Sequence, residues 1–339
     1  MSENIVGLDI GFGFTKASNG HRQWLFKSVA GRPPENMPPL TRAVAGEDFY
    51  TQDIELDGER YLVGESAERF APQRAAALEQ EDLLKITARP CGLAALARMA
   101  AGNGPISVVT GLPVSYFRDY HQKLAHLLLG WHEIACSDGH SGRISRRFHV
   151  ERIRVIPQPF GSVYALLLND LGRVVRPALT RQRLGVVDVG YRTADFCICD
   201  QTRLADEGLG SSDEGMFGAY QRIADAIEQA SGRRIELFRL HEAIAAGSIT
   251  VDDTVFDLSG ICSREFARLA ATLGTRLRKL WDMEHDLDGV VITGGGGAVL
   301  EPYLRKVLPG RIIGSKKAAD ARLGNVRGYW RYGVQLWQS

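Results

Sequence analysis

Residues 184–195 read Leu-Gly-Val-Val-Asp-Val-Gly-Tyr-Arg-Thr-Ala-Asp. In this stretch a single carboxylate, Asp188, interrupts an apolar run, and Gly190 follows two residues later. A short apolar run bounded by glycine is typical of a buried strand that ends in a turn. Thr193 stands three residues after the glycine. The stretch therefore predicts a buried strand whose closing turn presents an acid and a hydroxyl to a ligand.

The N-terminus repeats this order as Ile5-Val-Gly-Leu-Asp-Ile-Gly-Phe-Gly-Phe-Thr-Lys16. When one gap is allowed, the equivalent pairs are Asp9 and Asp188, Gly11 and Gly190, and Thr15 and Thr193. A single D-x-G sequence is most simply a strand end with a turn glycine. Its recurrence at equivalent places in the two halves favours a shared ligand site.

Both halves are expected to continue alike, with three antiparallel strands followed by a helix, a strand and a helix. The expected strands are 5–10, 15–18, 24–29 and 106–110 in the first half, and 185–188, 193–199, 203–207 and 290–293 in the second. The basic segment 143–154 is expected to form a pair of short strands. A duplicated α/β unit predicts two domains that face each other across a cleft, where ligands bind preferentially.

The chain has 339 residues, which exceeds the roughly 250–300 residues that one hydrophobic core usually organises. We predict two domains, residues 1–158 with 321–339 and residues 159–320, and a small outer subdomain at about 31–63. The net charge of +1 argues against direct binding of nucleic acid, which usually requires a strong basic excess.

The first residues carry no secretion signal, and the longest apolar runs fall short of the ~18–20 residues of a membrane span. Five scattered cysteines are most simply reduced core residues. We therefore expect a cytoplasmic protein without a membrane span.

The two glycine turns are expected to bring backbone N–H groups close to phosphate oxygens, because glycine has no Cβ. Lys16 can add a positive charge at the first turn. Asp9 and Asp188 beside a polyphosphate require a cation, and Mg²⁺ held largely through water is the expected one. The residues assigned to phosphate binding are Gly11, Phe12, Gly13, Phe14, Thr15, Lys16, Gly190, Tyr191, Arg192 and Thr193.

Two further motifs are candidates for the same site. Gly294, Gly295, Gly296 and Gly297 lie between a predicted buried strand and a helix, where an adenosine or α-phosphate can approach the helix start. Gln158 stands between two prolines before a helix, and an amide can orient a water for attack on a phosphate. Taken alone, Gln158 is more simply a surface amide.

In this order, the two D-x-G loops, Pro157-Gln-Pro159 and the glycine run resemble the signature of the superfamily of actin, heat-shock chaperones and sugar kinases. Within it, the sequence is most similar to bacterial actin-like proteins of the ParM/StbA type. Further similar segments are Tyr61-Leu-Val-Gly-Glu-Ser-Ala67, Gly111-Leu-Pro113 and the tail Gly324-Asn-Val-Arg-Gly328. The resemblance implies a duplicated actin-like (ribonuclease H-like) α/β ATPase fold with two domains around a nucleotide cleft.

The resemblance also implies an ATPase that binds ATP (or GTP) with Mg²⁺, polymerises into filaments and segregates plasmid DNA through a DNA-bound adaptor protein. By position, Asp9 and Asp188 are catalytic and hold the metal through water, and Gln158 positions the hydrolytic water. Gly294 to Gly297 correspond to the adenosine loop, and Asn325 to Gly328 to the second interdomain connection.

The sequence departs from the family pattern in both turns. Phe12 replaces a serine that contacts the γ-phosphate in actin, and Tyr191-Arg192 replaces small residues. Arg192 either contacts phosphate in compensation or points to solvent.

Other functions and partners stay open at this point. One is a sugar or small-molecule kinase on the same fold, although no separate carboxylate base for a substrate hydroxyl is evident. Another is a monomeric nucleotide-gated switch. Arg143, Arg146, Arg147, Arg152 and Arg154 can face an adaptor or DNA, or form a solvated strand face.

Overall fold

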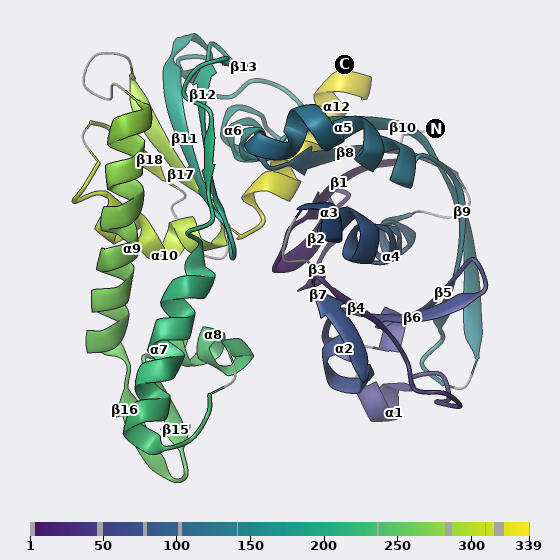
Figure 1. The fold of residues 1–339 in the computed structure, drawn as a ribbon. Helices are drawn as coiled ribbons and strands as arrows, with labels where there is room; N and C mark the ends of the chain where they lie inside the picture. Colours follow the sequence, from purple (N-terminus) through teal and green to yellow (C-terminus); the bar gives the residue numbers. More distant parts are fainter. Residues whose placement is uncertain are drawn as a thin grey trace. The chain divides into compact units, whose positions relative to one another are not determined.

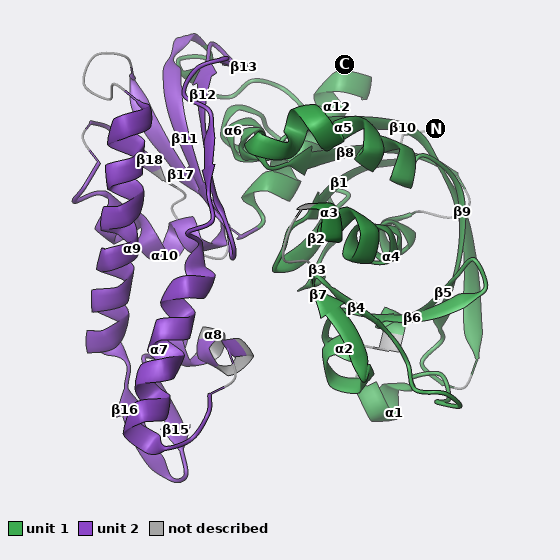
Figure 2. Cartoon of the chain, in the orientation of Figure 1, with its two compact units in different colours: residues 1–180, 323–339 green, residues 181–322 purple. Residues whose placement is uncertain are grey.

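The computed structural model describes residues 4–45, 50–76, 80–100, 104–140, 142–235, 237–281, 287–308, 310–314 and 322–338. Its elements are drawn in Figure 1. The chain divides into two compact units, residues 1–180 with 323–339 and residues 181–322 (Figure 2). Unit 2 is therefore an insertion in the chain of unit 1.

Unit 1 is built on a ten-stranded sheet with the order β3-β2-β1-β8-β10-β9-β5-β6-β4-β7. The central strands β1, β8 and β10 are parallel, and the other neighbours pair antiparallel. The strands are β1 Asn4–Ile10, β2 Phe14–Ser18, β3 Gln23–Lys27, β4 Val29–Arg32, β5 Asp53–Leu56, β6 Glu59–Val63, β7 Gln73–Ala76, β8 Pro105–Leu112, β9 Gly130–Ser137 and β10 Arg143–Pro157.

Helices cover both faces of the central strands of unit 1. Leu8 and Ile10 of β1 belong to a core that includes residues of α4 and α5. Gly7, one residue away on the opposite face, lies against α12, where a Cβ would come within 2.3 Å of the Val326 carbonyl oxygen. The helical segments are α1 Arg42–Ala45, η1 Tyr50–Gln52, α2 Gly64–Phe70, α3 Gln80–Asp82, η2 Leu83–Ala88, α4 Arg89–Met99, α5 Val114–Leu128, α6 Pro159–Leu167, η3 Leu179–Arg181 and α12 Gly324–Gln338.

Unit 2 repeats the central arrangement of unit 1 in a smaller sheet. The order is β13-β12-β11-β17-β18, with β14 on β12 and a separate β15-β16 hairpin. Again the first strand pairs antiparallel with the next and parallel with a later one. The elements are β11 Arg183–Val189, β12 Ala194–Asp200, β13 Arg203–Leu204, β14 Gly210–Ser212, α7 Met216–Ser231, α8 Leu237–Ala246, β15 Ser248–Val251, β16 Thr254–Asp257, α9 Ser259–Leu280, β17 Gly289–Thr293, α10 Gly295–Leu304 and β18 Ile312–Gly314.

The basic segment 143–154 does not form a strand pair of its own. It lies within the single 15-residue strand β10. The first part of β10 pairs with β9, and its last part pairs with β8. The prediction of two short strands was wrong because the partner of the alternating segment precedes it, at Gly130–Ser137.

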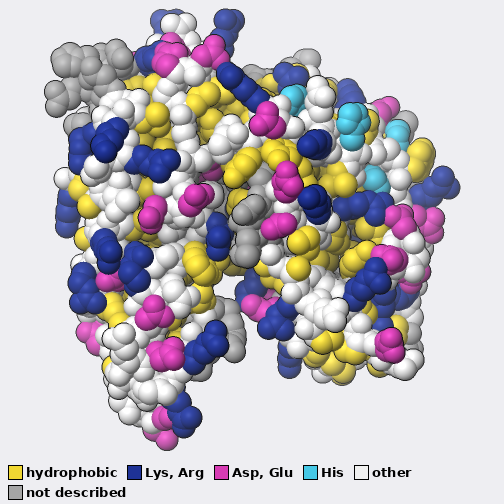
Figure 3. All heavy atoms as spheres, viewed as in Figure 1, with side chains coloured by type: hydrophobic (Ala, Val, Ile, Leu, Met, Phe, Trp, Pro, Cys, Tyr) yellow, Lys and Arg dark blue, Asp and Glu magenta, His cyan; other side chains and the backbone are white. Residues whose placement is uncertain are grey.

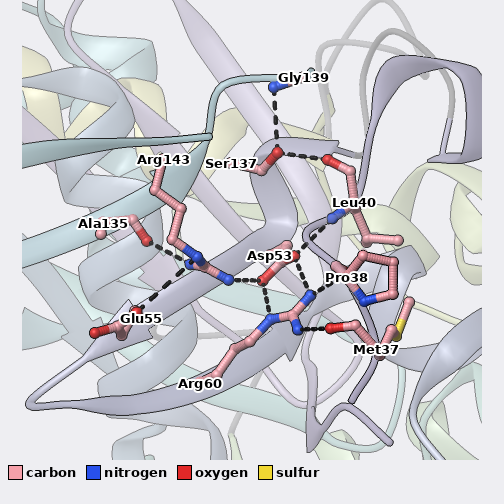
Figure 4. A network of polar contacts seen from close by, with 10 residues as sticks. All are labelled: Met37, Pro38, Leu40, Asp53, Glu55, Arg60, Ala135, Ser137, Gly139 and Arg143. Atoms are coloured by element: carbon pink, nitrogen blue, oxygen red, sulfur yellow. Dashed lines mark hydrogen bonds and ion pairs between the residues drawn. The ribbon is translucent and has the colours of Figure 1, made fainter. Parts of the chain in front are cut away.

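The proline-rich segment before β5 is fixed by one buried carboxylate, Asp53 (Figure 4). Asp53 accepts hydrogen bonds from the Arg60 guanidinium, from Arg143 Nη2 at 2.6 Å and from the Leu40 amide at 2.8 Å. Arg60 also donates to the Met37 and Pro38 carbonyl oxygens. This part of the predicted outer subdomain is therefore tied to β5, β6 and β10.

The return of the chain to unit 1 through α12 brings distant segments together. Asn325 Oδ1 accepts hydrogen bonds from the Ser162 amide and hydroxyl, at 3.1 and 2.6 Å. This contact and the packing of α12 on α6 place residues 159–180 in unit 1, whereas the sequence-based division assigns them to the second domain. The other predicted boundary, at residues 320 and 321, lies outside the described residues.

Candidate functional site

The turn between β1 and β2 is closed by a hydrogen bond from the Gly11 amide to the Phe14 carbonyl oxygen, at 3.1 Å. In the β1–β2 register, Asp9 lies opposite Lys16 and Ile10 lies opposite Thr15. Side chains that are directly opposite in an antiparallel pair share one face of the sheet. Asp9 and Lys16 therefore lie on the same face of the sheet.

Asp9 is completely buried, and both of its carboxylate oxygens have partners. Lys16 Nζ lies 2.8 Å from Oδ2, and Gln158 Nε2 donates to Oδ1 at 3.0 Å. The structure thus brings together three of the predicted site residues. The Lys16 ammonium neutralises the buried charge, which would otherwise be costly.

Gln158 is fixed through its backbone as well as its side chain. Its amide donates to the Leu112 carbonyl oxygen at 2.7 Å. Its own carbonyl oxygen accepts from the Gly161 amide and from the Tyr329 hydroxyl, both at 3.1 Å. Strand β8, helix α6 and helix α12 therefore all contribute to the position of this amide side chain.

The predicted role of Thr15 is not supported by its placement. Thr15 lies on the core face with Ile10, is completely buried, and its hydroxyl is hydrogen bonded to Ser28 Oγ at 2.8 Å. Phe12, from the same turn, packs against the core of unit 1. The alternation of side chains along β2 thus turns Lys16, and not Thr15, toward Asp9.

The turn between β11 and β12 has the same construction in unit 2. The Gly190 amide donates to the Thr193 carbonyl oxygen at 2.8 Å. Both turns span the same number of residues, so Thr193 is equivalent to Phe14. The predicted gap and the pairing of Thr193 with Thr15 were therefore wrong.

Asp188 has a second carboxylate opposite it, which the sequence reasoning missed. Asp195 lies directly across from Asp188 in the β11–β12 register, and the two residues are 4% and 5% exposed, respectively. The Ser211 hydroxyl donates to Asp195 Oδ1. Like charges directly opposite each other on a sheet are destabilising, so this pair favours a cation nearby. Asp188 and Asp195 stand at equal distances from the centre of the short turn, and this spacing could have predicted that they lie opposite each other.

The two residues at the tip of this turn lie against helix α7. The Tyr191 ring packs edge-on against Phe217, with ring centroids 5.7 Å apart. The Arg192 guanidinium carbon lies 5.1 Å from the centroid of the same Phe217 ring. The Tyr191 and Gly190 carbonyl oxygens accept hydrogen bonds from the Phe217 and Met216 amides, at 2.8 and 3.3 Å.

The glycine run begins helix α10 earlier than predicted, at Gly295. Gly294, with φ of 83°, precedes the helix and provides no side-chain cap. A Cβ on Gly294 would lie 2.3 Å from Asp188 Oδ1, and one on Gly296 would lie 2.5 Å from Met216 Cγ. Glycine is therefore needed at positions 294 and 296 because neighbouring residues of the protein leave no room for a side chain, whether or not a ligand binds. No side chain at Gly294 caps the first turn, and the positive end of a helix at its N-terminus favours anions.

On the face shown in Figure 3, the charges give no preference for one kind of partner. Basic and acidic side chains are interspersed there.

Within the described part of the chain, no group of three or more His, Cys, Asp or Glu residues can hold a metal ion. Mg²⁺ at phosphate sites needs only one or two carboxylates, with phosphate and water completing its ligands. The Asp188–Asp195 pair supplies that number of carboxylates.

Comparison with known families covers most of the chain. The family described as "Actin like proteins N terminal domain" matches residues 7–161, and "Archaeal actin homologue MreB-like, C-terminal" matches residues 186–306. The chain belongs to the actin-like proteins. No curated protein matched by sequence.

Solved structures share the fold over nearly the whole chain. The archaeal actin homologue Ta0583 with ADP has a TM-score of 0.79 and 18% identity, over 97% of this chain and 98% of the other. ParM in a 15-stranded filament from Clostridium botulinum has 0.75 and 21%, over 99% and 100%. Bacillus thuringiensis ParM with AMPPNP has 0.75 and 16%, over 99% and 100%. At these identities the likeness shows the fold alone, and it confirms the predicted two-domain α/β actin-like fold.

Among the described residues, no helix combines the length and the apolar character that crossing a bilayer requires.

Proposed function

We propose that this actin-like protein is a nucleotide-dependent, filament-forming ATPase. The observation that carries the proposal is the recurrence of one device in both units. In each unit a buried aspartate stands two residues before a glycine turn closed by the same backbone hydrogen bond. Such turns and the uncapped start of α10 offer backbone N–H groups to phosphate oxygens.

The proposed ligand is ATP, with GTP as the alternative purine nucleotide. The solved relatives with ADP and AMPPNP support an adenine nucleotide. The proposed binding residues are those predicted from the sequence, except that Thr15 is directed into the core. Placement of the nucleotide in a cleft between the domains stays a prediction from the sequence.

Mg²⁺ is the proposed companion of the nucleotide and would neutralise phosphate charge when bound. Asp188, which has Asp195 opposite it in the β11–β12 register, is the side chain that we propose holds it through water. At the other turn, Asp9 and Lys16 form an ion pair that fixes the first phosphate turn. We therefore propose that Asp9 contributes to the site by positioning Lys16 and Gln158 as well as by holding a cation.

Gln158 is the residue proposed to orient the attacking water. Its Nε2 is held by Asp9, which fixes the plane of the amide and leaves its oxygen to accept a hydrogen bond from water. An amide cannot serve as a strong base, so its contribution is orientation.

Assembly and biological role are proposed from the relatives. The ParM structure in a 15-stranded filament supports self-association. We propose that ATP binding favours filaments, that hydrolysis favours their disassembly, and that the filaments segregate plasmid or other DNA in the cytoplasm through a DNA-bound adaptor. A sugar or small-molecule kinase and a monomeric nucleotide-gated switch are the alternatives on this fold.

Sedimentation and phosphate release test the proposal together. We expect the protein to pellet at high speed with ATP or AMPPNP and Mg²⁺ but to remain in the supernatant with ADP. We also expect phosphate to be released from ATP without any added acceptor. A kinase would be nearly silent in the phosphate assay. Protein that binds ATP but stays in the supernatant at high concentration would contradict the filament proposal and favour the switch.

A further inference from the structure

The basic residue at the tip of the β11–β12 turn differs from the basic residue at the first turn in how its charge is held. Lys16 forms an ion pair with Asp9 at 2.8 Å. Arg192 is half-buried, its guanidinium lies over the Phe217 ring, and it has no ion-pair partner among the described residues. One turn therefore carries a neutralised cation and the other an available one.

Several other arginines of unit 2 are held by carboxylates. Arg183, Arg222, Arg233 and Arg305 each pair with a carboxylate. Arg192 instead lies over an aromatic face, and such a contact is weaker than the two parallel hydrogen bonds that a guanidinium makes with a phosphate group. A phosphate within reach of this side chain would therefore compete with the ring for the guanidinium.

The start of helix α7, next to Arg192, is not a second source of N–H groups for an anion. The first amides of α7, at Met216 and Phe217, are taken up by the Gly190 and Tyr191 carbonyl oxygens. Those amides are therefore unavailable to a phosphate. Close approach of turn and helix is enforced at Gly215, where a Cβ would lie 2.4 Å from the Arg192 carbonyl carbon. The backbone of the turn is consequently fixed on α7, and the guanidinium is held there by its contact with the Phe217 ring.

We propose that Arg192 recognises the terminal phosphate of a bound nucleoside triphosphate and that its stacking on Phe217 is its resting position. The inference rests on the proposed nucleotide binding and goes beyond it by assigning the discrimination between triphosphate and diphosphate to one side chain. The guanidinium donates two hydrogen bonds to terminal phosphate oxygens, and it stabilises the negative charge that spreads over them during hydrolysis. No proton is transferred by Arg192.

The test compares AMPPNP and ADP affinities, measured by titration calorimetry with Mg²⁺, in the wild type, Arg192→Ala and Arg192→Lys. We expect Arg192→Ala to weaken AMPPNP binding about tenfold or more, while ADP binding changes less than about twofold. Lysine keeps the charge but not the planar fork, so Arg192→Lys should recover only part of the preference. Single-turnover hydrolysis should fall roughly 100-fold or more in Arg192→Ala.

Two further variants separate recognition from structure. Arg233→Ala removes an exposed arginine on the segment after α7 and should leave both affinities unchanged. Phe217→Leu removes the ring that holds the resting guanidinium and should keep or increase the AMPPNP preference. A preference lost in Phe217→Leu would overturn the resting-position assignment.

Failure of this inference differs from failure of the proposed function. If the wild type binds neither nucleotide, the proposed function fails. If the wild type prefers AMPPNP and Arg192→Ala retains that preference, or loses both affinities equally, only the role of Arg192 is refuted.

Discussion

At the scale of single residues, Asp188 is the side chain whose removal tests the proposed site most directly. We expect Asp188→Ala to lower ATP hydrolysis by about 10–100-fold, because residues that hold a metal through water typically contribute that much. Asp188→Asn keeps the shape without the charge and should show a similar loss. Phosphate release at saturating ATP and Mg²⁺ measures both variants. Turnover equal to the wild type in either variant would refute the site assignment.

His132 gives a prediction about stability and pH. Burial lowers the pKa of His132, more than its hydrogen bond to the Leu128 carbonyl oxygen raises it. The folded state therefore favours neutral histidine, and this contribution to stability is present above the unfolded pKa of about 6.5 and is lost as pH falls through the lower folded pKa. We expect the melting temperature of His132→Gln to fall less between pH 7 and pH 5 than that of the wild type.

The exposed His126 on α5 provides the matched control for this measurement. His126→Gln should show the pH dependence of the wild type. If His132→Gln shows the same acid sensitivity as the wild type, burial of this imidazole does not contribute to it.

At the first turn, the sequence assigned Asp9, Lys16 and Gln158 to one site by the order of the motifs, and the structure brings the three side chains together. The contacts of Lys16 and Gln158 with Asp9 were not predicted, and their roles toward a phosphate and a water stay predictions. Thr15 was misassigned because hydroxyl was matched with hydroxyl, although the strand period turns this residue into the core. Asp195 was missed because the strand register depends on the length of the turn. The register that places Asp195 opposite Asp188 follows only when that length is assigned correctly.

At the scale of elements, the contact between α6 and α12 depends on a position where no side chain fits. A Cβ on Gly328 would lie 1.6 Å from the Gly161 carbonyl oxygen and 2.7 Å from the Ala165 amide nitrogen, all backbone atoms. We expect Gly328→Ala to destabilise the protein by about 3 kcal/mol, at the upper end of overpacking costs. Thermal or urea unfolding measures this loss.

Gly260, in the first turn of α9, is the control for that substitution. A Cβ there would meet nothing within 4 Å, so Gly260→Ala should be neutral or stabilise by about 0.5–1 kcal/mol. Equal effects of the two substitutions would mean that the α6–α12 approach does not limit stability.

Most elements could be predicted because their patterns are local. The strands before each glycine turn, the Asp57-Gly58 hairpin and helix α5 follow from apolar runs, turn residues and helical periodicity. Strand β10 could not be predicted, since its pairing with β9 and then β8 is set by tertiary partners. The start of α10 inside the glycine run likewise depends on β11 and α7, which lie against those glycines.

At the scale of the whole molecule, the duplication was readable from the sequence because each copy carries the same acid and glycine spacing. The allocation of residues 159–180 was less accessible, since it depends on α12, more than 150 residues further along the chain. A helix that returns from the end of the chain leaves no local signal in the segment on which it packs. The two family matches cover residues 7–161 and 186–306 and therefore both copies. They do not cover the segment between the copies.

The insertion of residues 181–322 into unit 1 has a mechanical consequence. Strand β1 near one end of the chain and helix α12 at the other pack together in unit 1 (Figure 1). A pulling force applied between the two ends is therefore carried first across β1, α6 and α12. Tension reaches unit 2 only after α6 and α12 separate, so the inserted unit is shielded from load until its host has opened.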